Sequence, residues 1–171
     1  MNPTHIALLR AVNVGGTGKL PMAELRAMAE ELGFTQVRTY IASGNLLVNS
    51  PLSAQRVREA LEARLAAYAG RAVGVVVRSP AELEALLAAN PFSDAAPNRV
   101  AISLLNEALS ADVAQGIRHQ SAEQIVWAAR EVYVHYGEGM AQSRLRIPAS
   151  EAGTARNLNT LRALLEMARG D

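Results

Sequence analysis

The fold of this 171-residue sequence is decided by Leu8-Leu9-Arg10-Ala11-Val12-Asn13-Val14-Gly15-Gly16-Thr17-Gly18-Lys19-Leu20. The apolar run 5–9 shows little alternation of apolar and polar residues, which is typical of a strand covered on both faces. The glycines let the backbone turn sharply, and Pro21 favours the first position of a helix. The stretch therefore predicts a strand, a glycine loop and a helix, an arrangement in which the start of the helix attracts anions.

Two familiar phosphate-binding signatures do not fit this stretch. A P-loop needs serine or threonine after Gly-Lys, but Leu20 follows Lys19, and Asn13 occupies the first glycine position. The dinucleotide fingerprint fails because Pro21 stands where its third small residue should be. Two interpretations stay open: an anion site, or a glycine-rich turn that only joins a strand to a helix.

Composition argues against several classes of protein. The formal net charge of +1 does not suggest tight non-specific binding to nucleic acids. The absence of cysteine excludes disulfides, thiol catalysis and thiolate metal sites. The N-terminal apolar run is too short for a signal peptide, and no apolar run approaches the roughly 18 residues of a membrane helix. We therefore expect a soluble, cytoplasmic protein.

The first eighty residues predict the order βαββαβ, which is the ferredoxin-like order. Strands are expected at 5–9, 37–41, 46–48 and 73–78, with a hairpin turn at 42–45. One helix is expected from Pro21 to Gly33. A second is expected after Ser53, which can cap it, and Gly70 follows its end.

Residues 81–171 predict a similar order without its last strand. Helices are expected at 82–88, at 111–117 and after Gly153, and strands at 100–105, 125–129 and 132–136. The sequence therefore predicts an α+β protein of two ferredoxin-like halves, residues 1–80 and 81–171, with mainly antiparallel sheets. Because three strands are apolar at consecutive positions, both of their faces should be covered. The halves should then pack together, or the chain should dimerise, so we expect a monomer or a homodimer.

Four blocks of the sequence resemble one known family. They are residues 9–16 with Lys19, Met22 and Leu25; Thr39-Tyr40-Ile41-Ala42-Ser43-Gly44-Asn45; Asn90-Pro91-Phe92; and Thr154-Ala155-Arg156-Asn157-Leu158-Asn159-Thr160. In this order they resemble the bacterial family catalogued as domain of unknown function 1697. The resemblance implies a small α+β protein with two ferredoxin-like halves, and it implies no activity. Ala11 stands where the family usually has glycine. Leu158 stands where it usually has tryptophan, which removes a stacking surface for a base or ring.

Three stretches contain no acidic residue: 1–23, 32–58 and 152–165. If they converge, they form a pocket with hydrogen-bond donors and no competing carboxylate. The candidate ligand-binding residues are Arg10, Asn13, Gly15, Gly16, Lys19, Ser43, Asn45, Arg156, Asn157 and Asn159. Each also has a structural interpretation, because asparagine and serine at turns usually bond their own backbone, and an arginine at a strand end is usually solvated.

Lys19 gives an independent indication of an anion. The 17 basic residues comprise this one lysine and sixteen arginines, so arginine is used wherever a positive charge alone is enough. A compact ammonium group is suited to a phosphate. We hypothesise that Lys19 and Arg156 approach one anion from different sides, while Asn13 and Asn45 fix the loop and the turn by bonding backbone groups.

The sequence shows no strong catalytic constellation. His5, His119 and His135 lie far apart without metal-ligand spacing, and no serine occupies a nucleophile elbow. We therefore name no catalytic residue, no metal and no cofactor, and leave open whether the protein is an enzyme. The favoured function is a pocket for a small anionic ligand, a phosphate or a carboxylate. The alternative is a weak nucleic-acid or protein-binding module with an open sheet face, which ranks lower because Tyr40 is the single aromatic residue near a basic segment.

Overall fold

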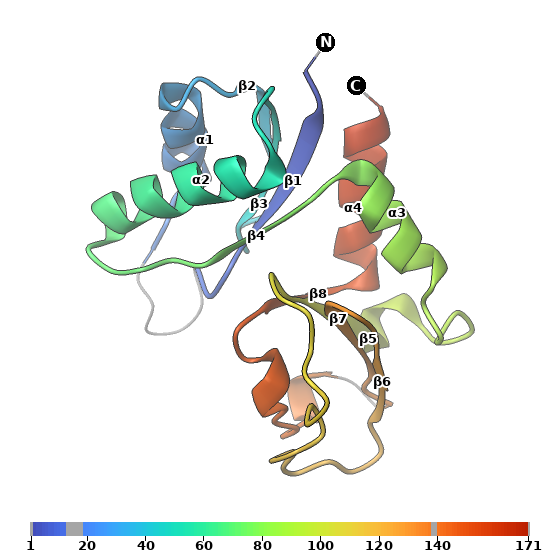
Figure 1. Cartoon of the computed structure of the whole chain (residues 1–171). Helices are drawn as coiled ribbons and strands as arrows, with labels where there is room; N and C mark the ends of the chain where they lie inside the picture. The colour runs from blue at the N-terminus through green and yellow to red at the C-terminus, as the bar shows by residue number, and fades with distance from the viewer. Residues whose placement is uncertain (1, 13–18, 138–139, 171) are drawn as a thin grey trace. The chain divides into compact units, whose positions relative to one another are not determined.

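The computed structural model describes residues 2–12, 19–137 and 140–170 of the chain. These residues form an α+β protein with two four-stranded antiparallel sheets and four α-helices (Figure 1). The chain divides into two compact units. The first unit comprises Met1–Leu83 with Leu164–Asp171, and the second comprises Glu84–Ala163.

The sheet of the first unit has the spatial order β2-β3-β1-β4. Its strands are β1 (Thr4–Leu9), β2 (Thr35–Thr39), β3 (Asn45–Asn49) and β4 (Val75–Arg78), and its helices are α1 (Met22–Glu31) and α2 (Ala54–Ala69). The order βαββαβ predicted for this part of the chain is confirmed. Within the sheet β1 is central, since Ile6 pairs with Leu47 on β3 and with Arg78 on β4.

Both faces of β1 are buried, as its unbroken apolar run predicts. Its residues 6–9 are at most 2% exposed. Ala7 and Leu9 belong to one core cluster with residues of α1 and α2. Residues 164–170 also group with this unit: Leu164 is fully buried, and Arg38 on β2 donates a hydrogen bond to the Met167 carbonyl at 3.2 Å.

The ends of the helices follow from local chemistry. Ser53 caps α2 as predicted, because its hydroxyl accepts a hydrogen bond from the Arg56 amide at 3.2 Å. Gly70 ends α2 in the left-handed conformation, with φ +71°. The prediction that Pro21 is the first residue of α1 is wrong by one position. Pro21 is extended, with ψ 140°, and it precedes the helix.

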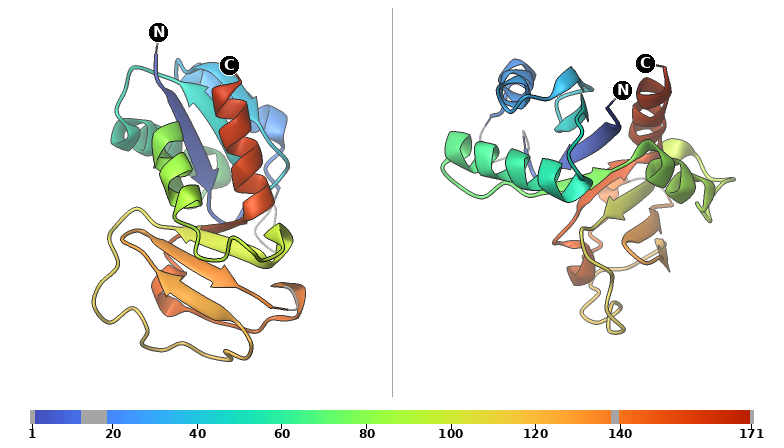
Figure 2. Two further views of the ribbon diagram at one scale, coloured as in Figure 1. Left: turned by 90° about the vertical axis from the view of Figure 1, so that its right-hand side faces the viewer. Right: turned by 45° about the horizontal axis from the view of Figure 1, so that its top comes forward.

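The sheet of the second unit has the spatial order β6-β7-β5-β8. Its strands are β5 (Val100–Leu104), β6 (Gln124–Trp127), β7 (Glu131–His135) and β8 (Thr154–Asn157); α3 (Pro80–Ala88) precedes them and α4 (Leu158–Arg169) follows them (Figure 2). Tyr133 on β7 ties the end of α3 to this sheet, because its hydroxyl donates to the Leu86 carbonyl at 2.7 Å. Desolvation by burial raises the pKa of Tyr133 to about 12.

Two predictions for the second half are wrong. Residues 111–116 form turns and not a helix. Gly116 has φ +78°, and the Ser110 hydroxyl donates to Asp112, a local bond that competes with helix formation. A fourth strand, which the prediction lacked, is present as β8, and it precedes the C-terminal helix where the ferredoxin-like order would place it after that helix. Its buried side chains, Thr154 and Arg156, are polar, so no apolar alternation marks the strand in the sequence.

Candidate functional site

A cavity of about 290 Å³ lies in the first unit. Val12 and Lys19, the two residues that flank 13–18 in the sequence, both line it. The remaining lining residues come from the segment before α1, the C-terminal part of α2 and the segment after it: Leu20, Leu65, Tyr68, Ala69, Arg71 and Val73. The cavity therefore lies beside the residues that bound the glycine stretch.

The lining of this cavity combines cationic and apolar side chains. Lys19 and Arg71 are exposed, whereas Val12, Leu65 and Val73 are buried. No carboxylate side chain is among the lining residues that the structure describes. The C-terminus of α2 contributes a partial charge of about −0.5, which is smaller than the two full positive charges. The described lining therefore carries a net positive charge.

Tyr68 and Arg71 were not predicted as site residues. The spacing of Tyr68 places it on the apolar stripe of α2, but it is 41% exposed and lines the cavity. A phenol hydroxyl can donate a hydrogen bond to an anion. Arg71 directly follows Gly70, the residue that ends α2, and this position was the signal that could have identified it.

Of the predicted residues, Ser43 lies in the hairpin turn and Asn45 is the first residue of β3, and neither lines the cavity. Asn45 is fully buried, and its Nδ2 donates to the Tyr40 carbonyl at 2.9 Å and to the Ser43 hydroxyl at 3.0 Å. The hypothesis that Asn45 fixes the turn by bonding a backbone group is confirmed.

The three predicted residues of the C-terminal block have separate local roles. Arg156, predicted to bind the ligand, is buried, and its Nη1 donates to Thr154 Oγ1 at 2.6 Å and to the Ala155 carbonyl at 2.9 Å. Burial lowers its pKa to about 10, so it remains protonated at neutral pH. Asn157 caps α4, because its Oδ1 accepts from the Thr160 amide at 2.9 Å.

Other members of the predicted set lie in simpler surroundings. Asn159 is exposed in the first turn of α4. Arg10 is also exposed, and its amide donates to the Gly74 carbonyl at 2.9 Å. Asn13, Gly15 and Gly16 lie outside the described residues. The hypothesis that Lys19 and Arg156 bind one anion stays a prediction.

The two positions at which the sequence differs from the pattern implied by its resemblance have clear structural settings. Leu158 is 1% exposed, so it is a core side chain. Ala11, where the resemblance implies glycine, adopts a left-handed backbone with φ +54°. This conformation is unfavourable for a residue with a Cβ atom and costs glycine little.

Ala11→Gly is therefore expected to raise the free energy of unfolding by about 0.5 to 1 kcal/mol, because relief of the left-handed strain exceeds the added flexibility of the unfolded chain. Urea denaturation measures this difference. Ala63→Gly, at an exposed position inside α2, is the matched control and should lower the free energy of unfolding by about 1 kcal/mol. Destabilisation by both variants would contradict the assigned strain at Ala11.

Two general searches complete the description of the site. In residues 2–12, 19–137 and 140–170, no group of three or more histidine, aspartate or glutamate side chains is placed to hold a metal ion. None of the helices in this part of the chain combines the length and the apolar character needed to cross a membrane.

Comparisons with known proteins identify the family. No curated protein matches the chain. A solved structure, that of a conserved bacterial protein from Streptococcus pneumoniae, is similar with a TM-score of 0.80 over 98% of this chain and 99% of that chain. The sequence identity is 24%, so this likeness shows a shared fold. The model of the family described as protein of unknown function (DUF1697) matches residues 2–133, and the chain therefore belongs to this family, as its sequence blocks predict.

Proposed function

We propose that the cavity beside Lys19 binds a small organic anion, a phosphate ester or a carboxylate. The observation that supports this most is that Lys19 and Arg71 line the same cavity as several apolar side chains, with no carboxylate among the lining residues that the structure describes. Ammonium and guanidinium groups form charge-assisted hydrogen bonds with phosphate and carboxylate oxygens. The phenol of Tyr68 offers a further donor.

The apolar lining indicates that the ligand carries more than its anionic group. Val12, Leu65 and Val73 give inorganic phosphate nothing to bind, but they can cover a ring or a short aliphatic chain. The volume of about 290 Å³ is near the lower end of the range of about 300 to 1,000 Å³ found for small-molecule sites. We therefore infer a ligand of metabolite size.

Binding is the proposed role because the described lining offers little for catalysis. It contains no histidine and no carboxylate that could serve as a general base. A metal or a cofactor is not part of the proposal.

Phenyl phosphate is a suitable probe because it joins a phosphate group to an apolar ring. It should bind more tightly than inorganic phosphate or phenol, as isothermal titration calorimetry can measure. Lys19→Ala and Arg71→Ala should each weaken its binding by about ten- to a hundredfold, since a charge-assisted hydrogen bond contributes about 1.5 to 3 kcal/mol. The free energy of unfolding should barely change, because both side chains are exposed.

Arg56→Ala provides the matched control. It removes the same charge from the first turn of α2, about 18 Å along the helix from Tyr68. Phenyl phosphate should bind this variant as it binds the unaltered protein. If phenyl phosphate does not bind, or if all three variants weaken it equally, the cavity is not the proposed site.

The alternative function requires an open sheet face, and no specific observation favours it. Ile6, Ala7 and Leu8 on β1 and Ile102 on β5 are each at most 2% exposed, so these central strands do not present an apolar surface to a partner. A cytoplasmic location and a monomeric or homodimeric state remain predictions from the sequence.

We also propose that both halves of the chain are variants of the ferredoxin-like fold. The support is the strand order, since the second, third, first and fourth strands follow one another across each sheet. In the second half, turns stand where the first half has α1, and the short 3-10 helices Met140–Gln142 and Pro148–Ser150 stand where it has α2.

A further inference from the structure

A second cavity, of about 550 Å³, lies in the second unit and has a different chemistry. Its lining residues are Arg118, His119, Arg144, Arg146, Pro148 and Glu151. Pro148 is the one apolar residue of this set. With His119 counted as neutral, the three guanidinium groups and one carboxylate among the described lining residues carry a charge of +2, which exceeds the net charge of +1 of the whole chain.

The arginines lie in two irregular segments, between β5 and β6 and between β7 and β8, where the first unit has helices. One face of the second sheet is covered by irregular segments, in which Ile117, Leu145 and Ile147 pack against the core residues Val132 and Val134. The neighbours of these anchors in the sequence, Arg118, Arg144 and Arg146, are exposed. The apolar side chains thus attach each segment to the core, and the arginines next to them in the sequence line the cavity.

Arg118 and Arg146 occupy directly opposed positions of an isolated antiparallel bridge. The amide of each residue donates to the carbonyl of the other at 2.9 Å. In such a hydrogen-bonded pair the Cα atoms are about 5.5 Å apart, and the side chains project to the same face. Like charges at these positions repel each other, so the fold holds together two groups that an anion between them would stabilise.

A buried carboxylate holds the segment that carries Arg144. Glu123 is 7% exposed and accepts hydrogen bonds from the Ser143 hydroxyl and from the Ser121 amide, the latter at 2.5 Å. These bonds, the one from Ser143 foremost, lower the pKa of Glu123. The Ser143 hydroxyl also accepts from the Leu145 amide at 3.2 Å. Arg144 therefore lies between two residues whose positions are fixed.

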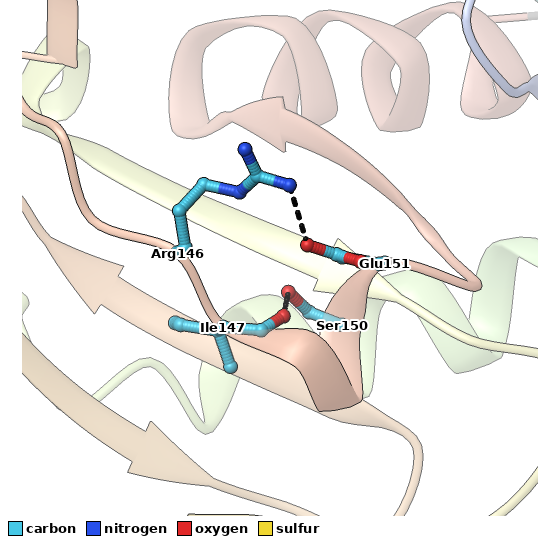
Figure 3. Close-up of polar contacts among 4 residues, drawn as sticks. All are labelled: Arg146, Ile147, Ser150 and Glu151. Atoms are coloured by element: carbon cyan, nitrogen blue, oxygen red, sulfur yellow. Dashed lines mark hydrogen bonds and ion pairs between the residues drawn. The ribbon is translucent and has the colours of Figure 1, made fainter. Parts of the chain in front are cut away.

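The carboxylate of the cavity neutralises one arginine in part. Figure 3 shows Arg146 reaching Glu151, with Nη2 and Oε1 2.9 Å apart, next to a turn in which the Ser150 hydroxyl donates to the Ile147 carbonyl. Both partners are half exposed or more, at 67% and 50%. Such a pair is weak in water and can be replaced by a stronger anion.

We propose that this cavity binds the di- or triphosphate group of a small molecule. Several guanidinium groups around one space suit an anion with several charges and many acceptor oxygens, because each group can form two parallel hydrogen bonds. The volume is almost twice that of the first cavity, and Pro148 is the one apolar residue among the lining residues that the structure describes. The ligand is thus recognised by its chain of phosphates.

Inorganic tripolyphosphate is the probe, and its binding is measured by isothermal titration calorimetry with the full chain. Arg118→Ala and Arg144→Ala should each weaken binding by about tenfold. Glu151→Gln should strengthen it by a few fold, because it removes the one carboxylate among the lining residues that the structure describes. Arg162→Ala removes an exposed arginine of α4 that does not line the cavity and should change the affinity by less than about twofold.

Lys19→Ala separates this proposal from the proposed function. It should weaken phenyl phosphate and leave tripolyphosphate unaffected, so either site can fail alone. The inference is overturned if tripolyphosphate does not bind, if Arg162→Ala weakens it as much as Arg118→Ala, or if Glu151→Gln leaves the affinity unchanged. It is also overturned if a short single-stranded RNA binds and tripolyphosphate does not compete, because the surface would then recognise a nucleic-acid backbone.

Discussion

Gly44→Ala is expected to lower the free energy of unfolding by about 3 kcal/mol or more, from left-handed strain and overpacking together. Gly44 has φ +88°, and a Cβ atom there would lie 2.6 Å from Val12 Cγ2 and 2.8 Å from Leu9 Cβ. Both neighbours are buried, so neither can move aside freely. The clash would also disturb the hydrogen bond from the Leu9 amide to the Gly44 carbonyl, which is 2.8 Å long.

Gly33→Ala separates the two causes of this loss. Gly33 has φ +89°, close to that of Gly44, but a Cβ atom there would meet nothing within 4 Å. Urea denaturation should therefore show only the conformational part of the loss, about 1 to 2 kcal/mol. Equal losses in the two variants would mean that the close packing at Gly44 is not what requires glycine.

Leu161→Ala should lower the free energy of unfolding by about 2 to 5 kcal/mol, because it leaves a cavity in the core. Leu161 is fully buried on α4. The affinity of the folded protein for phenyl phosphate should not change, since Leu161 does not line the cavity beside Lys19. Stability is measured by urea denaturation. Binding is measured separately, under conditions in which all of the variant protein is folded.

Arg162→Ala is the control for this variant. Arg162 is the next residue of α4 and is exposed, so its replacement should change the free energy of unfolding by no more than about 0.5 kcal/mol. A similar loss for both variants would indicate that α4 responds to any substitution, and the packing of Leu161 would not be the cause.

The sequence predicted correctly those elements in which the apolar pattern and the residues at the ends indicate the same structure. Residues 6–9 are apolar without interruption and form a strand buried on both faces, and Ser53 supplies the cap of α2. Prediction failed where polar residues replace the usual pattern. β8 has Thr154 and Arg156 as its buried side chains, and the turns before Gly116 are held by a local bond from Ser110 to Asp112. In these segments local hydrogen bonds and tertiary contacts outweigh the apolar periodicity that the prediction depended on.

The candidate site was predicted in part, for a similar reason. Lys19 stood out as the single lysine and lines a cavity, whereas Asn45 and Asn157 bond backbone amides and carbonyls close to them in the chain. The partner of Lys19 in that cavity, Arg71, is separated from it by 52 positions in the sequence. Spacing along the chain does not reveal such a pair. The two residues line one cavity because Arg71 follows the end of α2, which also lines it.

The membership of residues 164–170 in the first unit affects the order in which the protein can fold during synthesis. Leu164 is buried, and the Met167 carbonyl accepts the hydrogen bond from Arg38 on β2. About 80 residues separate Leu83 from Leu164, and a ribosome adds about 5 to 20 residues per second, so roughly 4 to 16 s pass between the two. During that interval the nascent chain lacks part of the first unit. Until then the first unit lacks the buried side chain of Leu164, and β2 lacks the carbonyl that accepts from Arg38.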